Sequence, residues 1–417
     1  MLLSWAAVVF WNLAKPLPPG THIVSQVYRL SEGDVDFLVE SPRHPDAVGR
    51  DLSAIDRAEQ LIVVDRSPLP APLAQRLRAR KRLRPRLKIL LVTDPRGEAF
   101  GGTSPRSLAS LEEAGIIVAR VRLDRLRDSN PLYTGLWRLA FAWWSDPFDE
   151  TWGRATPPAW LRLQNSKSDH RQFLVADDGS GGWTAVMGKD GDPATLVLRG
   201  SLARSMIAGE LKTAAWSTDD DRLPADPPVS GGGVGSIDAR FLTEGAIESA
   251  LKDAIAAAGP GDRIGIAVQT LSERRLIGAA LRAAARGVQL QVILGRDAGT
   301  NRAVAAELAR EGGGRIEVRW DARAAETPGP PLLWMRHGAD FWMNMGSANF
   351  TRRDLSDLNL AAGVELRMPA RTAPARAVSG YFASLWSGAQ ADAAFADHSR
   401  VAYWRYRFAE WTGMSSF

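Results

Sequence analysis

Two short runs of polar residues, far apart in the chain, carry the residue types that phosphate chemistry needs. The first contains His170, Gln172 and Asp177, and the second is the turn-like run 346–349, Gly-Ser-Ala-Asn. Neutral imidazole is a good nucleophile, and its pKa suits proton transfer near neutrality. A Gly-Ser-x-Asn turn offers a hydroxyl, an amide and free backbone N–H groups to phosphate oxygens. The two runs together indicate a phosphodiester site, although Gly, Ser and Asn also populate ordinary turns.

The spacing within the first run indicates which side chains would share a ligand. On an extended strand residues i and i+2 face the same side, so His170 and Gln172 would point at one substrate. Asp177 lies five residues beyond Gln172 at an expected hairpin turn, where a structural role fits better than a catalytic one. Gln172 carries no charge, and a phosphate site lacking a cation loses about 2–4 kcal/mol of transition-state stabilisation. Lys167 or Lys189 could supply that charge, the alternative being two solvated lysines.

The composition excludes several classes of site. The chain has 417 residues, no cysteine and five histidines, which removes disulfides, thiolate catalysis and cysteine-ligated metals. No metal and no cofactor is expected. Hydrophobic content of 45% and charged content of 24% are those of a globular protein. A basic segment, residues 76–88, could meet anionic lipid or nucleic acid, or could be the solvated end of a helix.

Both ends of the chain are apolar and aromatic. Residues 1–13 form an apolar run with Trp5 and Trp11 that is shorter than the ~20 residues of a membrane span. It could be the stub of an anchor, an interfacial segment or a helix packed on the protein. Residues 403–408 alternate aromatics with arginines and could lie on a lipid interface or pack as a C-terminal element.

Hydrophobic periodicity divides the chain into two halves of one design. Each half alternates strands and helices and then closes with a hairpin-like pair and a helix. The closing elements are expected at 172–176, 184–188 and 201–216, and again at 332–336, 341–345 and 375–386. We therefore expect an apolar N-terminal segment 1–20, a first half 21–216, a linker 217–240 and a second half 241–417. The predicted fold is α/β, with two similar halves, each a mixed β-sheet flanked by helices, packed about a pseudo-two-fold axis with a site at the seam.

The motifs resemble those of one family. His170-x-Gln172-x4-Asp177 looks like the His-x-Lys-x4-Asp motif of the phospholipase D superfamily, with Gln in place of Lys. The run 346–349, followed by Phe-Thr-Arg-Arg and Asp-Leu-Asn-Leu, is similar to the block after the second copy of that motif. Residues 15–20 and 406–414 resemble the bacterial cardiolipin-synthase-like branch. The resemblance implies that a histidine from each half meets at the seam, one forming a phosphohistidine and the other protonating the leaving alcohol.

The second copy of the motif departs from the family. Matching His337-Gly338 to the usual Asp-Gly places Pro330 where the histidine belongs and Leu332 where the lysine belongs. Ala361 stands where an acidic residue that orients a histidine often occurs. His337 itself is expected to be a residue of a hairpin turn.

Two functions remain open on this basis. The first is a phosphodiesterase or phosphatidyltransferase acting on phospholipid, with His170, Gln172 and Asp177 as the catalytic set. The second is a pseudoenzyme that binds lipid headgroups, nucleic acid or a protein partner. In either case the phosphate ligands are expected to be Ser347, Asn349, Lys189 and Lys167. A membrane surface is the expected partner, at the bacterial inner membrane or its periplasmic face, with a cytoplasmic place left open.

Overall fold

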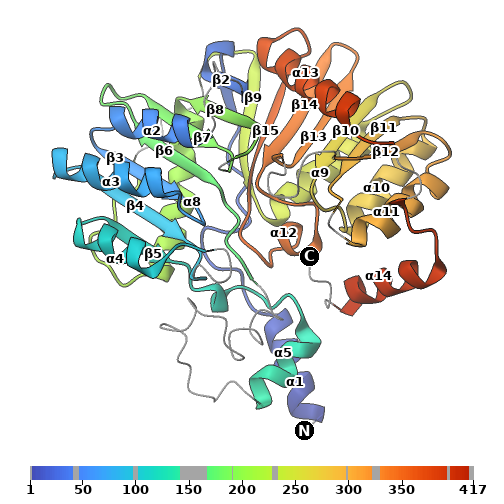
Figure 1. Cartoon of the computed structure of the whole chain (residues 1–417), viewed down its shortest axis with the longest axis horizontal. Helices are drawn as coiled ribbons and strands as arrows, with labels where there is room; N and C mark the ends of the chain where they lie inside the picture. The colour runs from blue at the N-terminus through green and yellow to red at the C-terminus, as the bar shows by residue number, and fades with distance from the viewer. Residues whose placement is uncertain are drawn as a thin grey trace.

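The computed structural model describes residues 2–40, 47–96, 102–140, 167–189, 191–227, 233–296, 299–321, 329–391 and 395–412. Within them two mixed β-sheets lie side by side, each with helices on its outer face (Figure 1). This confirms the predicted fold class of two mixed sheets flanked by helices.

The first sheet has the strand order β2-β8-β7-β6-β3-β4-β5. Its strands are β2 (Val35–Val39), β3 (Leu61–Asp65), β4 (Lys88–Thr93), β5 (Ile117–Arg120), β6 (Phe173–Asp177), β7 (Trp183–Met187) and β8 (Ala194–Arg199). Its helices are α2 (Ala47–Arg57), α3 (Ala71–Leu83), α4 (Pro105–Glu113) and the closing helix α8 (Ser201–Ser217).

The second sheet repeats this order as β9-β15-β14-β13-β10-β11-β12, with β1 added beside β9. Its strands are β1 (Tyr28–Leu30), β9 (Ile237–Thr243), β10 (Arg263–Val268), β11 (Gln289–Leu294), β12 (Ile316–Trp320), β13 (Leu332–His337), β14 (Asp340–Gly346) and β15 (Ala362–Pro369). Its helices are α9 (Gly245–Ala257), α10 (Arg274–Ala285), α11 (Gly299–Glu311), the short α12 (Arg352–Leu355) and the closing helix α13 (Ala373–Gly388). The two halves therefore share one topology.

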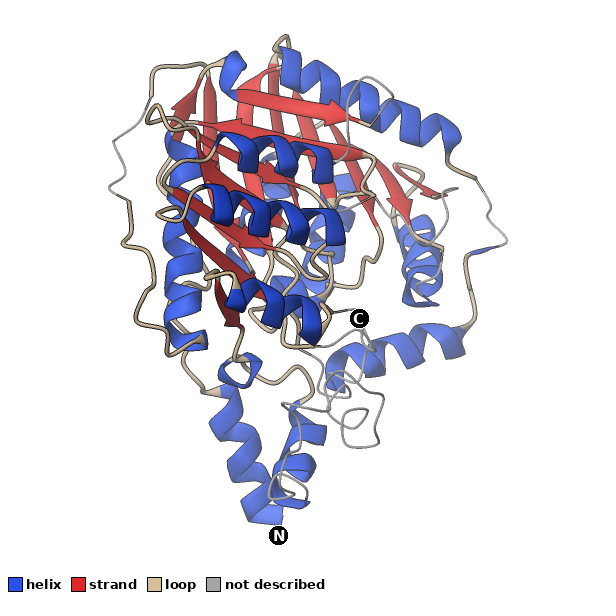
Figure 2. Cartoon of the chain, turned by 60° about the vertical axis from the view of Figure 1, so that its left-hand side comes forward, coloured by secondary structure: helices blue, strands red, loops and turns tan. Residues whose placement is uncertain are grey.

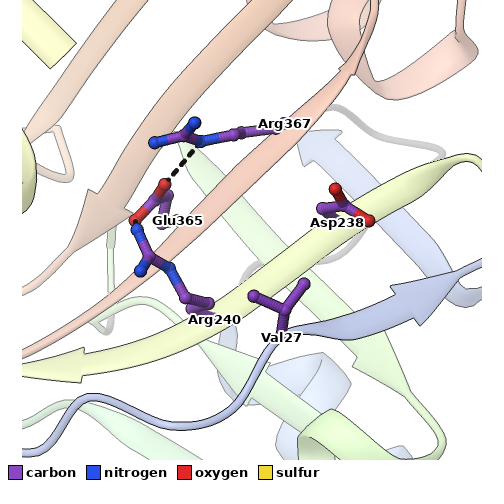
Figure 3. A pocket seen from close by; sticks show the side chains of 5 residues that line it. All are labelled: Val27, Asp238, Arg240, Glu365 and Arg367. Carbon is purple, nitrogen blue, oxygen red and sulfur yellow. Dashed lines mark hydrogen bonds and ion pairs between the residues drawn. The ribbon is translucent and has the colours of Figure 1, made fainter. Parts of the chain in front are cut away.

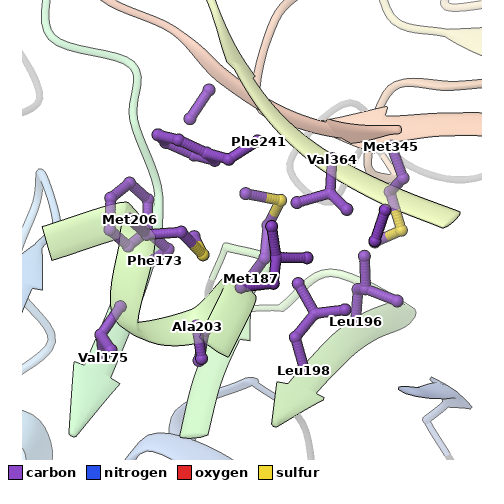
Figure 4. Packing of buried hydrophobic residues seen from close by; sticks show 14 of the residues in the cluster. Phe173, Val175, Met187, Leu196, Leu198, Ala203, Met206, Phe241, Met345 and Val364 are labelled. Carbon is purple, nitrogen blue, oxygen red and sulfur yellow. The ribbon is translucent and has the colours of Figure 1, made fainter. Parts of the chain in front are cut away.

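Strand residues alternate between two cores. Val63 and Val175 point into a central cluster that contains residues of both sheets, whereas Ile62 and Val64 point into a cluster beneath α2, α3 and α4. Figure 4 shows the central cluster, where side chains of β6 and β7 meet those of β9, β14 and β15. The rings of Phe173 and Phe241, one from each half, lie 5.7 Å apart edge to face. The halves are thus joined by a continuous apolar core.

The N-terminal residues change the predicted boundaries. β1 lies within the segment assigned to the first half, yet it pairs antiparallel with β9 of the second sheet, Tyr28 opposite Ala239. The linker also ends earlier than expected, because β9 begins at Ile237. The chain thus crosses to the second sheet before it builds the first. No periodicity over a three-residue strand could reveal this.

Of the described helices, three lie outside the two sheets, in the lower part of the molecule as drawn in Figures 1 and 2. They are α1 (Leu2–Leu13), α5 (Pro131–Ala140) and α14 (Arg400–Thr412). Two further 3-10 turns cover Glu32–Asp34 and Leu123–Arg125. Among the described helices, none combines the length and apolar character needed to cross a bilayer.

Candidate functional site

A short stretch of parallel β-pairing connects the two halves at the ends of their sheets. Asp169, just before β6, forms a parallel bridge with Leu360, just before β15. The His170 N–H donates to the Leu360 carbonyl at 2.8 Å, and the Leu360 N–H donates to Ser168 at 2.9 Å. The sequence motif of the first half is therefore held against the segment that follows the Gly-Ser-Ala-Asn turn of the second half.

His170 forms a hydrogen bond across this seam with a buried carboxylate. Its Nδ1 lies 3.0 Å from Asp354 Oδ1, and the imidazole is 35% exposed whereas the Asp354 side chain is 2% exposed. A carboxylate only accepts hydrogen bonds, so the imidazole proton resides on Nδ1 and neutral His170 keeps its lone pair on Nε2. This is the tautomer that a nucleophilic or basic histidine requires.

Asp354 is itself held in place by three donors. Oδ1 accepts from Asn359 Nδ2 at 2.7 Å as well as from His170, and Oδ2 accepts from the Asn349 N–H at 2.9 Å. Thr351 caps the first turn of α12 by accepting from the Asp354 N–H. The Asn359 amide oxygen in turn accepts from the Ser168 N–H at 3.0 Å. The carboxylate is thus fixed in position and fixes the imidazole in turn.

The Gly-Ser-Ala-Asn turn supports this network chiefly through its backbone. Gly346 must be glycine because a Cβ there would lie 2.0 Å from the Ala362 carbonyl oxygen. The Ser347 hydroxyl accepts from the Ala362 N–H at 3.1 Å and lies 3.3 Å from its carbonyl, so it ties β14 to β15. Asn349 contributes its N–H to Asp354, while its buried Oδ1 has no hydrogen-bond partner among the described residues. The predicted role of Ser347 and Asn349 as phosphate ligands stays a prediction.

The other polar residues of the first motif occupy different surroundings. The Gln172 amide donates to the Ser67 carbonyl at 2.8 Å, at the carboxyl end of β3. Lys167 is buried, its ammonium 2.6 Å from Asp128 Oδ1, and burial lowers its pKa. Lys189 follows β7 at the same sheet edge as His170 and is exposed. Lys189 therefore has a solvent-exposed side chain at the sheet edge where His170 lies, whereas the ammonium of Lys167 is paired with Asp128.

Asp177 lies at the opposite end of β6. Its carboxylate accepts from the backbone N–H groups of Glu59, Gln60 and Leu61 at 2.7–3.1 Å, and from Gly179 at 2.9 Å. Seven residues of extended chain place it about 23 Å from His170. The structure thus does not bring Asp177 into the site, and its contacts are those of a residue that anchors a strand end.

Strand pairing corrects the predicted place of the missing motif by one residue. Phe173 pairs with Met187 and Asp65, and Leu332 pairs with Met345 and Ala267 in the same arrangement. Leu332 therefore corresponds to Phe173, not to Gln172.

Gly329 and Pro331 then occupy the positions of His170 and Gln172. The backbone agrees, since Gly188 N–H donates to Gln172 as Gly346 N–H donates to Pro331. The expectation of Pro330 and Leu332 arose from counting across hairpin turns of different lengths. The second half lacks the His-x-Lys pair in either register.

The halves differ again in the segment that joins the last two strands. Between β14 and β15 this connector contains α12, Asp354 and Asn359, but between β7 and β8 it is only residues 188–193. The first half thus has the histidine but a short connector, and the second has the longer connector that carries Asp354 but no histidine. The His170–Asp354 pair is therefore built from both halves, across the seam.

Arg171, next to His170, is fully buried and links three parts of the chain. Its guanidinium bonds to Glu244 at 2.7 Å at the start of the second half, to Glu210 of α8 at 2.8 Å, and to the Gly20 carbonyl at 2.7 Å. Hydrogen bonds to two carboxylates and a carbonyl offset the cost of burying the guanidinium. Arg171 therefore fixes the backbone that carries His170.

Two further buried carboxyls, Asp65 and Asp169, lie near Arg171. Burial raises the pKa of each well above its ordinary value, with Asp169 and Glu210 adding to the effect at Asp65. Glu244 also has a raised pKa because of burial, opposed by Arg171. Burial thus favours the protonated forms of Asp65 and Asp169, which lowers the negative charge of the buried cluster around Arg171.

A second histidine lies beside the seam. His22 Nδ1 is 2.9 Å from Asp357 Oδ1, and the His22 N–H donates to Glu244 at 2.7 Å. His22, Glu244 and Asp357 are the described non-glycine residues with positive φ, at 53°, 46° and 60°. Three residues of unfavourable backbone conformation, joined through His22, indicate that the surrounding packing determines the backbone of this junction. The sequence offered no signal for it.

The second sheet also carries a pocket of about 180 Å³, lined by Val27, Asp238, Arg240, Glu365 and Arg367 (Figure 3). Buried Glu365 accepts from Arg240 at 2.6 Å, from Arg367 at 2.9 Å and from Trp342 at 2.9 Å. Arg240 and Arg367 are thus both paired with Glu365, whereas Asp238 lies 3.7 Å from Arg29. His337 lies elsewhere again, at the tip of the β13–β14 hairpin, where Asp262 at 2.8 Å raises its pKa.

Sequence reasoning missed Asp354 because it sought the acidic partner at position 361. The signal was present: Thr351 followed three residues later by an acid is a helix-start pattern. Such a pattern shows that Asp354 begins a helix but not that it faces His170. Within the described residues no group of three potential ligand side chains is arranged to hold a metal.

Comparison with known proteins agrees with this architecture. Residues 251–386 match a family model described as cardiolipin synthase, PLD-like domain. No curated protein is significantly similar in sequence.

Two solved structures have a related fold. Phosphatidylserine synthase from Haemophilus influenzae Rd KW20 superposes with a TM-score of 0.60 over 96% of each chain at 10% identity. Polyphosphate kinase from Porphyromonas gingivalis superposes with a TM-score of 0.53 at 12% identity; the match covers 92% of this chain and 54% of the kinase chain. At such identities the likeness concerns the fold. Residues 251–386 thus match a PLD-like domain of the cardiolipin-synthase type, and the first half repeats the strand order of the sheet to which those residues belong.

Proposed function

We propose that this protein acts on a phosphodiester through His170, with a phospholipid as the substrate class. The observation that carries the proposal is the hydrogen bond from His170 Nδ1 to buried Asp354, which leaves Nε2 unprotonated and partly exposed. A pseudoenzyme need not keep both members of such a pair in place across two halves of the chain.

The chemistry follows from that tautomer. The Nε2 lone pair attacks phosphorus, a P–N bond forms, and the P–O bond to the leaving alcohol breaks. Water protonates the departing alkoxide, because the second half supplies no histidine at the corresponding position Gly329. Water or a substrate hydroxyl then attacks the phosphohistidine, its proton passes to the hydroxide left by the first step, and the P–N bond breaks with release of neutral His170. Asp354 stabilises the positive charge on the imidazole in both steps.

The missing groups make this a slow catalyst. General acid catalysis contributes about 10²–10⁴-fold, most of all for poor alkoxide leaving groups. A phosphodiester with a good leaving group, such as p-nitrophenol, should therefore react much faster than a phospholipid. The phosphate is expected to be held by Ser347, Asn349 and Lys189, with Gln172 beside the nucleophile.

The test is to trap the intermediate. The purified full chain is incubated with ³²P-labelled phosphatidylglycerol in mixed micelles and examined for acid-labile, base-stable label. Label on the protein that His170→Ala removes would support the proposal. His337→Ala is the matched control, because His337 is also paired with a carboxylate but lies on the β13–β14 hairpin tip. Equal background label and equal turnover in the parent protein, His170→Ala and His337→Ala would contradict catalysis and leave only the pseudoenzyme function.

A membrane location is part of the same proposal. Phospholipid headgroups are presented at a bilayer surface, so a protein of this function must reach one. The bacterial inner membrane or its periplasmic face is the proposed place. Nucleic acid would be the substrate if the same trapping succeeded with a labelled oligonucleotide and failed with lipid.

A further inference from the structure

Helix α14 exposes a stripe of large apolar side chains. Val401, Trp404, Phe408 and Trp411 are 77%, 67%, 57% and 81% exposed. Steps of three and four residues return to one face of a helix, so the four side chains occupy an arc of roughly 80°. Isolated exposed apolar residues are ordinary, but two tryptophans and a phenylalanine in one stripe are characteristic of an interaction surface.

The opposite face of α14 fixes the helix to the second half. Ala402, Tyr406 and Glu410 are buried there. The Tyr406 hydroxyl donates to the Ser272 carbonyl at 2.9 Å, and Arg352 of α12 lies 3.4 Å from the Glu410 carbonyl. The stripe is therefore presented outward by a docked helix.

Arginines border the stripe on both sides. On the helical wheel Arg405 lies on one side of it, and Arg400 and Arg407 lie on the other. The one acidic residue of the helix, Glu410, is on the packed face. An apolar centre with cationic margins matches the boundary between acyl chains and anionic headgroups.

The α1–α5 pair presents a second apolar surface at the same end of the molecule (Figures 1 and 2). Leu2, Leu3, Phe10 and Trp11 of α1 are exposed, as are Leu132, Leu136 and Leu139 of α5. The helices pack closely, since a Cβ on Gly135 would lie 2.6 Å from Trp5 Nε1. Arg138 and Lys15 lie over the Trp11 ring at 5.4 and 5.8 Å.

Both surfaces are attached directly to the site. Arg352, which contacts α14, is two residues from Asp354. Lys167, which bonds to Asp128 beside α5, is three residues from His170. A planar surface that touches α14 and the α1–α5 pair together would therefore face the end of the molecule where His170 lies.

We propose that α14 and the α1–α5 pair together seat this protein in the interfacial layer of an anionic phospholipid bilayer, with Trp404, Phe408 and Trp411 as the inserted side chains. Tryptophan prefers that layer because its ring is apolar while its N–H reaches water. The inference deepens the proposed function by naming the surface on which the substrate is met, but binding does not depend on turnover.

The experiment measures co-sedimentation with vesicles. The full chain should pellet with vesicles of phosphatidylcholine containing 30% phosphatidylglycerol, and weakly with phosphatidylcholine alone. Trp404→Gln/Trp411→Gln should weaken partitioning by about tenfold or more, as expected for two large apolar side chains removed from a lipid contact. Leu83→Gln, an equally exposed apolar residue at the end of α3, is the matched control and should leave binding unchanged.

The charge component is tested in the same assay. Arg400→Gln/Arg405→Gln should weaken binding to the anionic vesicles by about tenfold while leaving binding to phosphatidylcholine nearly unchanged. Arg315→Gln, at the start of β12, is the control and should have no effect. Equal partitioning of the tryptophan variant and the parent protein would overturn the proposal. So would a dimer in sedimentation velocity that this variant dissociates, since the stripe would then bind a second copy.

Two readouts separate this inference from the proposed function. His170→Ala should pellet with vesicles as the parent protein does. The tryptophan variant should still form phosphohistidine from a monomeric short-chain phosphatidylglycerol, and lose activity only on vesicles. Vesicle binding without ³²P label on the protein would overturn only the proposed function. Labelling of the protein without vesicle binding would overturn only the proposed membrane-binding surface.

Discussion

The two halves of this chain share one strand order but contribute different parts to the site. The first half provides His170 and joins β7 to β8 by a short connector. The second half has Gly329 at the corresponding position and a longer connector that carries Asp354. The two frameworks have the same topology, and each carries one member of the His170–Asp354 pair. The comparison teaches that a His–Asp pair at the seam can be assembled from both halves.

The largest effect should come from removing the carboxylate contributed by the second half. Asp354→Asn keeps the size of the side chain but lets an amide donate to His170 Nδ1, which stabilises the wrong tautomer. Turnover should fall by about 10²–10⁴-fold with little change in stability, as in triad enzymes. Phosphohistidine formation and thermal melting measure the two quantities.

Asp357→Asn is the control for Asp354→Asn. Asparagine tolerates positive φ and can still accept from the Gly245 N–H, which Asp357 does at 2.9 Å. Turnover within about threefold of the parent protein is expected, because Asp357 pairs with His22 and not with His170. Equal losses in the two variants would show that the connector acts as a whole and that Asp354 has no special role.

The next effect concerns what holds the halves together. Arg171→Met leaves Glu210 and Glu244 buried without their guanidinium, so the free energy of unfolding should fall by about 3–5 kcal/mol. Urea denaturation followed by tryptophan fluorescence measures it. Arg66→Met breaks a comparable buried pair with Asp51, 2.8 Å apart, but inside the first half.

The two arginine variants should differ in the form of the transition. Losing Arg171 weakens the contact between halves, so unfolding should become broader or separate into two steps. Losing Arg66 should shift the transition without separating it. A single sharp transition in Arg171→Met would show that the apolar core alone couples the halves.

A smaller effect is expected from restoring a cation to either half. Gln172→Lys should raise phosphohistidine formation by roughly tenfold, because it places a charge beside the nucleophile. Pro331→Lys makes the corresponding change in the second half, where no histidine is present, and should have no such effect. Faster labelling in Pro331→Lys would mean that both halves face the substrate equally.

The smallest effect is the pH dependence contributed by Asp65, a residue of the first half that corresponds to Ala267 in the second. The folded state keeps Asp65 protonated at pH values where the unfolded chain, with a pKa of about 4, has released the proton. Asp65 therefore costs stability progressively as pH rises above about 4. Asp65→Asn imitates the protonated acid, so its gain in unfolding free energy over the parent should grow from pH 5 to pH 8. An advantage independent of pH would contradict the raised pKa.

Much of the fold was predictable because hydrophobic periodicity is local. The alternating strands and helices, the hairpins and both closing helices were found within a few residues. β1 was missed, as were β2, β8, β9 and β15. β1 has only three residues, too few to show a periodicity, and its partner is about two hundred residues away in the chain. Tertiary pairing alone assigns it to the second sheet.

The site was predictable only in part, for a related reason. His170 and the Gly-Ser-Ala-Asn run are motifs that can be read locally. Asp354, Arg171 and Glu244 matter through contacts that cross the seam, which no local pattern records. The same limit explains the one-residue error at Gly329 and Pro331, since strand register depends on pairing and not on counting from a turn.

The hydrogen bond between His170 and Asp354 joins residues 184 positions apart in the chain. During synthesis the histidine therefore emerges from the ribosome long before its carboxylate, and domains generally fold in the order in which they emerge. A first half that folds alone carries a histidine without its partner and an Arg171 without Glu244. The pair can form only after the second half has been synthesised, so a stalled or truncated chain is expected to lack it.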